Sequence, residues 1–143
     1  MKVLVINGPN LNFIGIREKG IYGNNSYNDL VNYLKELGND MNVEIDVYQS
    51  NHEGCIIDKL QEAYFEKVDG IIINAGAFTH YSYAIRDAIA STSIKTIEVH
   101  LSDITKREAF RQVSVINEVC EKSFFGKHFL SYKEALEYLV NNR

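Results

Sequence analysis

The sequence predicts an α/β fold in which a parallel β-sheet is covered by helices on both faces. Short apolar runs rich in β-branched residues occupy positions 3–6, 71–73 and 96–99, and each ends at a polar loop. Runs of this kind are typical of strands that are buried in a parallel sheet. Segments with helical periodicity alternate with these runs, which favours βαβ units.

The first strand, at 3–6, is followed by a long loop and then by a helix over residues 26–37. Apolar side chains recur in this helical segment with the spacing of one helical face. Ser26 and Asp29 have the spacing of a capping pair at the helix start, and Gly38 is expected to end the helix.

The middle of the chain continues the alternation of strands and helices. Val43, Ile45 and Val47 alternate with polar side chains, as expected for a strand with one exposed face. The further elements that we expect are a helix over 56–64, a strand over 71–73, a helix over 81–90 and a strand over 96–99.

The C-terminal part has weaker patterns. Here we expect a helix over 110–119, a short edge strand over 123–125 and a last helix over 132–140. The five strands would form a doubly wound, flavodoxin-like parallel sheet within a three-layer α/β/α architecture. No long linker interrupts the pattern, so residues 1–143 are expected to form a single catalytic domain.

The composition limits the classes of function. The formal net charge of −4 argues against a general nucleic-acid role but leaves room for a local basic pocket. No apolar run approaches the ~20 residues of a membrane-spanning helix, and no signal-peptide pattern is apparent at the N-terminus. Cys55 and Cys120 have no metal-type or redox-type spacing, which favours a reduced, cytoplasmic environment.

Several common chemistries lack their sequence patterns. The loop at 7–12 does not have the glycine spacing of a dinucleotide-binding or P-loop motif. The histidines lack the HExxH spacing of zinc enzymes, no Gly-x-Ser-x-Gly elbow is present, and no lysine interrupts the apolar strands. We therefore expect no metal site, no serine nucleophile of the hydrolase type and no buried Schiff-base lysine.

Polar side chains gather where three of the predicted strands end. The segments are 7–12 (NGPNLN), 74–80 (NAGAFTH) and 100–103 (HLSD). In open α/β sheets, ligands bind outside the carboxyl ends of the strands. The three segments are therefore expected to share one site.

Glu98 and His100 are the first candidates for chemistry in this site. They are two residues apart on a strand, so both side chains point to the same face of the sheet. A carboxylate beside an imidazole orients the ring and favours its protonated form, which makes His100 a candidate general acid. The alternative is a solvated pair at the sheet edge.

The segment 17–25 is rich in glycine, has no clear periodicity and is expected to act as a lid. Tyr22 and Arg17 lie in it. A free tyrosine is a poor base near neutral pH, but a nearby guanidinium stabilises the phenolate and lowers the pKa. The pair could then remove a carbon-bound proton. The alternative is a loop tyrosine that packs over the core.

Neutral side chains and backbone groups in the same loops are candidates for binding. Asn12 and Asn74 suit the hydroxyls of a polar ligand or a developing enolate oxygen, although asparagine is also common in turns. The backbone N–H groups of Leu101 and Ser102 could bind a carboxylate, and Ser102 could instead be a helix cap.

Charged residues follow on two helical segments. Arg107 and Arg111 are four residues apart and would share one helical face, where paired guanidinium groups suit a bidentate carboxylate contact. A solvated charged face is the alternative. His80 and Asp87 lie near the start and the middle of another helix, where they could bind hydroxyls or simply decorate the helix.

Ordered short motifs cover nearly the whole chain. They are 7–12 (NGPNLN), 17–18 with 22–23, 49–54 (QSNHEG), 74–77 with 79–80, 86–88, 98–102 (EVHLS), 107–108 and 110–111. In their order and spacing, these motifs resemble the type II 3-dehydroquinate dehydratase family as far as about residue 139.

The resemblance implies a hydro-lyase that reversibly converts 3-dehydroquinate into 3-dehydroshikimate, by trans elimination through an enolate. It implies that Tyr22 is the base and that Arg17 lowers the pKa of Tyr22. Asn12 would hold the enolate through an ordered water. His100 would protonate the departing hydroxyl, while Glu98 orients the imidazole ring.

Substrate binding and assembly are also implied by the resemblance. The groups that would bind the substrate's carboxylate and hydroxyls belong to Asn74, His80, Arg111 and the backbone of Leu101 and Ser102. Asp87 would reach the site of a neighbouring subunit in a dodecamer built from trimers. The family uses no metal and no organic cofactor, and it acts in the shikimate pathway towards chorismate and the aromatic amino acids, or in the quinate pathway.

The chain departs from the usual family pattern at four positions, which are Lys19, Phe78, Lys122 and His128. A second hypothesis is a non-catalytic, flavodoxin-like binding module for a small polar acid. A phosphate-receiving module would want an acidic cluster after the first strand, where this chain has Asn7 and Asn10 instead.

Overall fold

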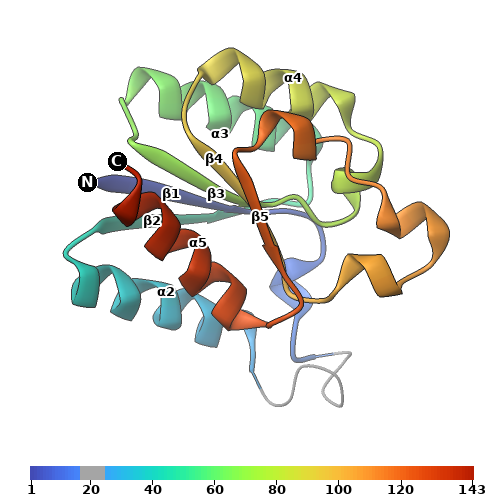
Figure 1. Ribbon diagram of the computed structural model, residues 1–143, viewed down its shortest axis with the longest axis horizontal. Coiled ribbons are helices and arrows are strands. Elements are labelled where there is room, and N and C mark those ends of the chain that lie inside the picture. The colour runs from blue at the N-terminus through green and yellow to red at the C-terminus, as the bar shows by residue number, and fades with distance from the viewer. Residues whose placement is uncertain (17–24) are drawn as a thin grey trace.

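A five-stranded, all-parallel sheet forms the centre of the protein (Figure 1). The computed structural model describes residues 1–16 and 25–143. The strand order is β2-β1-β3-β4-β5, which is that of the flavodoxin-like fold. The strands are β1 (Lys2–Asn7), β2 (Glu44–Gln49), β3 (Gly70–Asn74), β4 (Thr96–His100) and β5 (Lys122–Phe125).

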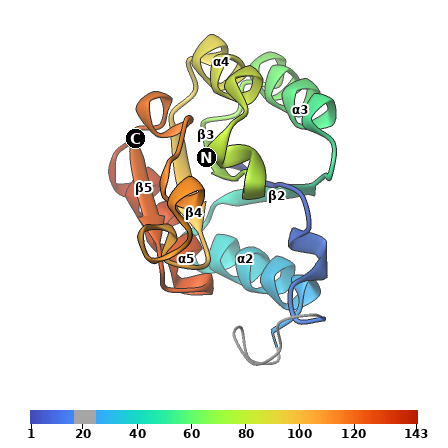
Figure 2. The same ribbon diagram turned by 90° about the vertical axis from the view of Figure 1, so that its right-hand side faces the viewer.

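Two pairs of helices cover the two faces of the sheet (Figures 1 and 2). α2 (Tyr27–Met41) and α5 (Phe129–Asn141) pack on one face, and α3 (Glu53–Phe65) and α4 (Tyr83–Thr92) pack on the other. Each face has its own apolar cluster, because successive side chains of a strand point to opposite sides. The predicted three-layer, doubly wound fold is confirmed.

The start of α2 agrees with its sequence prediction, but the end does not. Ser26 and Asp29 form a complete capping box, with each side chain bonded to the other residue's backbone N–H. Gly38 does not end the helix, which continues to Met41 and is followed by Asn42 in the left-handed conformation. A Cβ at Gly38 would lie 2.7 Å from the carbonyl oxygen of Val43, so close packing explains this glycine.

The predicted helix over 110–119 is wrong. This part of the chain forms short 3₁₀ helices, at Ile104–Lys106, Ala109–Gln112 and Asn117–Val119. The backbone N–H of Val115 donates to the Thr79 carbonyl, 2.8 Å away, and this tertiary contact interrupts a continuous helix. The edge strand β5 and the last helix α5 were both predicted, and α5 begins earlier than expected, at Phe129.

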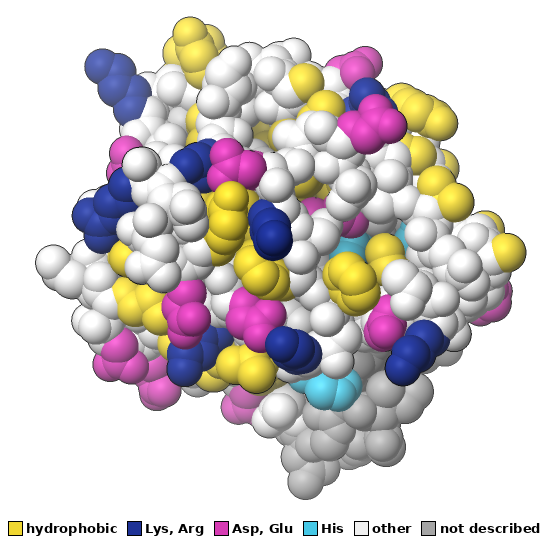
Figure 3. All heavy atoms as spheres, in the orientation of Figure 1, with side chains coloured by type: hydrophobic (Ala, Val, Ile, Leu, Met, Phe, Trp, Pro, Cys, Tyr) yellow, Lys and Arg dark blue, Asp and Glu magenta, His cyan; other side chains and the backbone are white. Residues whose placement is uncertain are grey.

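The surface visible in Figure 3 mixes both signs of charge, with Lys and Arg side chains interspersed among Asp and Glu. No helix within the two described ranges has the length and apolar composition that a membrane crossing requires. The predicted lid, with Arg17 and Tyr22, lies outside the described residues apart from Asn25.

Candidate active site

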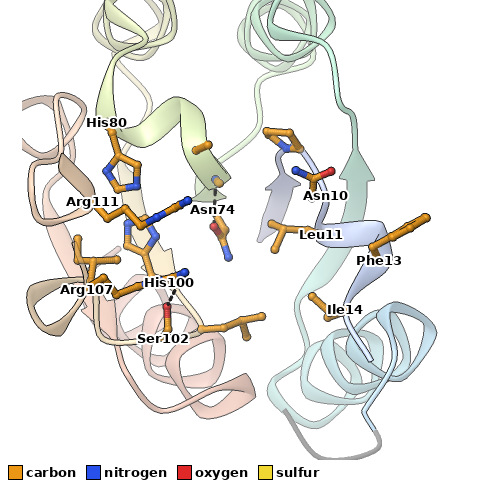
Figure 4. Close-up of a pocket in the computed structure, with 15 residues that line it drawn as sticks. Asn10, Leu11, Phe13, Ile14, Asn74, His80, His100, Ser102, Arg107 and Arg111 are labelled. Atoms are coloured by element: carbon orange, nitrogen blue, oxygen red, sulfur yellow. Dashed lines mark hydrogen bonds between the residues drawn. The ribbon is translucent and has the colours of Figure 1, made fainter. Parts of the chain in front are cut away.

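A pocket lies outside the carboxyl ends of β1, β3 and β4, where the sequence predicted a shared site (Figure 4). The strand order reverses between β1 and β3, and ligands of open α/β sheets bind at this point. The cavity measures about 320 Å³. Its lining residues are Pro9, Asn10, Leu11, Phe13, Ile14, Asn74, Gly76, Ala77, His80, His100, Leu101, Ser102, Ile104, Arg107 and Arg111.

The loop after β1 packs closely against the end of β3. The backbone N–H of Gly8 donates to the Asn74 carbonyl at 2.7 Å. A Cβ at Gly8 would lie 2.5 Å from the backbone oxygen of Ala75, so only glycine fits at this approach. The Gln49 amide donates to the Gly8 carbonyl at 3.1 Å and so ties the loop to the end of β2.

Asn74 is almost completely buried, and its amide is held in one orientation. Its Oδ1 accepts from the backbone N–H of Gly76 at 3.2 Å, and its Nδ2 donates to the Tyr132 hydroxyl at 3.0 Å. The Tyr132 hydroxyl in turn donates to Asn7 Oδ1 at 2.6 Å. Burial raises the pKa of Tyr132 far above its ordinary value, so the hydroxyl keeps its proton as a donor.

Sequence reasoning missed this network. Tyr132 lies on α5, 58 residues from Asn74 and 125 from Asn7. A buried tyrosine hydroxyl needs a polar partner, but the helical pattern around Tyr132 gives no sign of which residues supply it. The signal lies in the tertiary fold alone.

Glu98 and His100 form a buried pair, so the alternative of a solvated edge pair is wrong. The two residues are 1% and 6% exposed, respectively. His100 Nε2 lies 2.6 Å from Glu98 Oε2 and donates its proton, since an ionised carboxylate can only accept. Burial acts to raise the pKa of Glu98, but hydrogen bonds from His100, Ser114 and Asn117 and the charge of His100 outweigh it and hold this pKa below its usual value.

His80 reaches the pocket from the 3₁₀ helix Gly76–His80. Its Nδ1 lies 2.7 Å from the Val113 carbonyl oxygen, which can only accept, so Nδ1 carries a proton. The ring also packs edge-on against Phe110. The neutral tautomer therefore has Nε2 as an acceptor, which suits a substrate hydroxyl.

Arg107 and Arg111 both line the pocket, although the helix that was expected to align them does not form. Arg107 lies 3.4 Å from the Ser102 hydroxyl, to which it donates (Figure 4). The Arg111 guanidinium stacks on Phe110 at 4.7 Å and contacts Glu108 at 3.4 Å. A local basic rim therefore exists on a chain with net negative charge.

The backbone after β4 supplies another part of the lining. Leu101 is buried, its carbonyl accepts from the backbone N–H of His128 at 3.0 Å, and Ser102 follows it at the pocket wall. Across the pocket lie Leu11, Phe13 and Ile14, which form an apolar wall that the sequence patterns did not single out (Figure 4).

Three of the predicted site residues that the structure describes do not line this pocket, which are Asn12, Asp87 and Glu98, and Glu98 is linked to the pocket by its contact with His100. Asn12 is exposed, and its Oδ1 accepts from Gln49 Nε2 at 3.4 Å. Asp87 is exposed on α4 and does not line the pocket. Arg17 and Tyr22 lie outside the described residues. Within the described ranges, no cluster of three or more His, Cys, Asp or Glu side chains could hold a metal ion.

Comparisons with known proteins agree over nearly the full length. Residues 1–140 match the family described as Dehydroquinase class II. The chain is 54% identical over 142 residues to the 3-dehydroquinate dehydratase of Lachnospira eligens, covering 99% of this chain and 97% of that protein.

Solved structures are similar in fold as well. The crystal structure of type II dehydroquinase from Butyrivibrio crossotus has a TM-score of 0.95 at 59% identity, covering 97% of each chain. That of the type II dehydroquinase from Propionibacterium acnes has a TM-score of 0.93 at 34% identity, covering 99% of this chain and 97% of that one. Since residues 1–140 match the family model and the fold is shared, this chain belongs to the class II dehydroquinase family.

Proposed function

We propose that the chain is a type II 3-dehydroquinate dehydratase, a hydro-lyase that converts 3-dehydroquinate into 3-dehydroshikimate and water. Its family and the names of its relatives support this activity. The observation that carries the chemistry is the buried His100–Glu98 pair, which meets a pocket with a cationic rim. His100 could act as the acid in an elimination reaction, and the guanidinium groups of Arg107 and Arg111 could bind the carboxylate of a ring-shaped substrate.

The reaction needs a base and a separate acid. Tyr22 is the proposed base, which takes the proton next to the ketone after Arg17 has stabilised its phenolate. The electron pair of that C–H bond forms an enolate, whose oxygen Asn12 stabilises through a water. The enolate then expels the hydroxyl group, His100 protonates it, and water leaves as the conjugated double bond forms.

The His100–Glu98 contact suits the role of the acid. Glu98 accepts a hydrogen bond from the Nε2–H group of His100. The other ring nitrogen, Nδ1, is therefore the one that can give a proton to the substrate. The negative charge of Glu98 stabilises the imidazolium before the transfer. The ring is also fixed in direction, because both partners are buried.

The remaining predicted residues are proposed to bind the substrate. Arg111 and the backbone N–H groups of Leu101 and Ser102 suit the carboxylate, since charge-assisted hydrogen bonds are the stronger kind. Asn74 and His80 suit the ring hydroxyls. All five residues line the pocket, which supports the assignment.

Assembly and cellular context are further proposals. We propose a dodecamer built from trimers in which Asp87 completes the site of a neighbouring subunit, and its exposed position on α4 is compatible with this. We propose a cytoplasmic enzyme of the shikimate pathway, and the free thiols of Cys55 and Cys120 are compatible with a reduced environment. Light scattering of the purified protein measures the mass of the assembly, and a monomeric mass would contradict the dodecamer.

The activity test measures the ultraviolet absorbance of the enone product when 3-dehydroquinate is added to the purified protein without metal. We expect turnover in the wild type, and a loss of kcat of about 10²- to 10⁴-fold in Tyr22→Phe and in His100→Ala. Asn142→Ala, at the end of the sheet away from the pocket, should keep wild-type kcat. Full activity in Tyr22→Phe would rule out the assigned base, and binding without turnover in the wild type would favour the binding-module hypothesis.

A further inference from the structure

Three polar side chains that the proposed mechanism does not use surround the carboxylate of Glu98. The Ser114 hydroxyl donates to Oε2 at 2.8 Å, the same oxygen that His100 contacts. The Asn117 amide donates to Oε1 at 3.3 Å, and the Ser123 hydroxyl donates to Oε1 at 3.2 Å. We call Ser114, Asn117 and Ser123 the carboxylate cage.

Together with His100, the cage gives each carboxylate oxygen two donors. An ionised carboxylate has about four acceptor positions, so His100 and the cage together occupy all of them. Asn117 Nδ2 can only donate, and it also donates to Ser123 Oγ at 3.0 Å, which leaves the Ser123 proton free to point at Glu98. The pattern of donors therefore fits the ionised form of Glu98 and not the protonated form.

The cage residues come from three places in the fold. Ser123 is on β5, in register with Glu98 on β4. Asn117 begins the 3₁₀ helix Asn117–Val119, and Ser114 precedes it. The hydrogen bond from Val115 N–H to the Thr79 carbonyl fixes this segment, so the interruption of the predicted helix is what turns Ser114 and Asn117 towards Glu98.

Few other titratable groups face this carboxylate. Among the described residues, Cys120 interacts with Glu98, and burial followed by the charge of Glu98 raises the pKa of its thiol to about 12, so it is neutral. Arg86, from α4, bonds the Val115 carbonyl and pairs with Glu118 rather than with Glu98. Among the titratable groups described, His100 is thus the cationic partner of the Glu98 carboxylate.

We propose that Ser114, Asn117 and Ser123 are positioning residues of the dehydratase, which keep Glu98 ionised and in one orientation so that His100 presents its proton to the substrate. This inference rests on the proposed role of His100 as the acid. A buried charge without such partners is costly, because neither water nor another dipole replaces its lost hydration. The three side chains supply that replacement.

The test compares kcat, KM and the pH profile of kcat/KM in Ser114→Ala, Asn117→Ala and the double variant. We expect kcat to fall about tenfold in Ser114→Ala, as for the loss of one hydrogen bond to a charged group, with KM changed by less than about twofold. In Asn117→Ala, kcat should fall less, because the hydrogen bond from Asn117 to Glu98 is longer than that from Ser114. Since each lost donor destabilises the ionised form, the pKa of Glu98 rises. Protonation of Glu98 then adds to protonation of the base Tyr22, so the acidic limb of the profile becomes steeper and moves to higher pH.

A matched pair on the edge strand separates hydrogen bonding from packing. Ser123→Thr keeps the hydroxyl group. Ser123→Val places a side chain of nearly the same shape as threonine there, but without the hydroxyl, and both residues suit a strand. We expect Ser123→Thr to resemble the wild type and Ser123→Val to show the lower kcat and the shifted acidic limb. This pair also covers the case in which Ser114→Ala does not fold, as judged by circular dichroism.

Three results would overturn the inference in distinguishable ways. If His100→Ala loses activity while all the cage variants keep wild-type kcat and an unshifted acidic limb, the cage has no part in catalysis and the proposed function stands. If His100→Ala is fully active, His100 is not the acid, and the proposed positioning role of the cage is then wrong as well. A lower melting temperature with unchanged kinetics would likewise reduce the cage to a structural role.

Discussion

The floor and the rim of the pocket are built in different ways. We define the floor as Asn74 and His100, which line the pocket at strand ends, together with Glu98, which contacts His100 from within β4. All three are buried and make hydrogen bonds of 2.6 to 3.3 Å. The rim is Arg107 and Arg111. Arg107 directly follows the 3₁₀ helix Ile104–Lys106, Arg111 lies in Ala109–Gln112, and their side chains contact Ser102 and Glu108 at 3.4 Å. The floor is fixed by the sheet, whereas the rim can adjust.

The difference matches the demands of the two tasks. A proton-transfer group must already point at the reacting atom, because reorientation during the reaction would add to the barrier. A carboxylate-binding cation acts through charge over a longer range and tolerates movement. We therefore expect floor substitutions to act mainly on kcat and rim substitutions mainly on KM.

Among the tests of this comparison, the largest effect is expected for Glu98→Gln, although it should not exceed the effect of removing the His100 imidazole itself. The amide has nearly the same shape but no charge, and its NH₂ group would meet the donors that now point at the carboxylate. We expect kcat to fall about 100-fold with little change in KM, measured by steady-state assay. The matched control is Glu118→Gln on the surface. A change confined to KM would remove the distinction between floor and rim.

Arg111→Ala should show the opposite pattern. Loss of a charge-assisted contact with the substrate is expected to raise KM about tenfold and to change kcat by less than about threefold. Arg111→Lys keeps the charge without the planar fork, and an intermediate KM would indicate a bidentate contact. If kcat falls as strongly as in Glu98→Gln, Arg111 belongs functionally to the floor.

Tyr132→Phe tests how the floor is supported from below. The variant leaves Asn7 Oδ1 and Asn74 Nδ2 without their buried partner, which should cost about 1–3 kcal/mol of unfolding free energy. Because the Asn74 amide is then held only by the backbone N–H of Gly76, we also expect a several-fold rise in KM. Urea unfolding and kinetics measure the two effects, with exposed Tyr83→Phe as the control. Unchanged stability would show that the network contributes little.

His128→Gly is expected to stabilise the start of α5, where the backbone N–H of residue 128 donates to the Leu101 carbonyl. His128 has φ 53° and ψ −130°, a conformation that glycine adopts more easily than other residues. We expect the unfolding free energy to rise by about 1 kcal/mol. Since the backbone bond from His128 to Leu101 remains, kcat/KM should stay within about twofold. A lower melting temperature would show that the imidazole contributes more than the strain costs.

The smallest effect is a difference in thiol labelling between Cys120 and Cys55. Burial and then the charge of Glu98 raise the pKa of Cys120 from 9.0 to about 12, so at pH 8 its reactive thiolate is scarce. Cys55 is exposed. Cys120 is half-buried. We expect a maleimide to label Cys55 at once and Cys120 much more slowly, as mass spectrometry would show with Cys55→Ser as the control. Equally fast labelling of Cys120 would mean that burial and the charge of Glu98 do not suppress its thiolate.

Local patterns were enough to predict most of the fold. The β-branched runs became β1, β3 and β4, and Ser26 with Asp29 formed the predicted cap. The same runs located the pocket, because parallel strands bring their carboxyl ends to one edge. Patterns failed where distant residues decided the outcome. Gly38 is set by the carbonyl of Val43, and the helix over 110–119 is replaced by segments anchored to Thr79.

The sequence by itself determined the architecture, the family and the pairing of Glu98 with His100, since these depend on periodicity and on neighbouring residues along the chain. Only the tertiary structure decided that this pair is buried, that Tyr132 holds Asn74, and that Ser114, Asn117 and Ser123 surround Glu98. The physical reason is that a buried polar group must find partners wherever the fold brings them close, and no local pattern records which residues those will be.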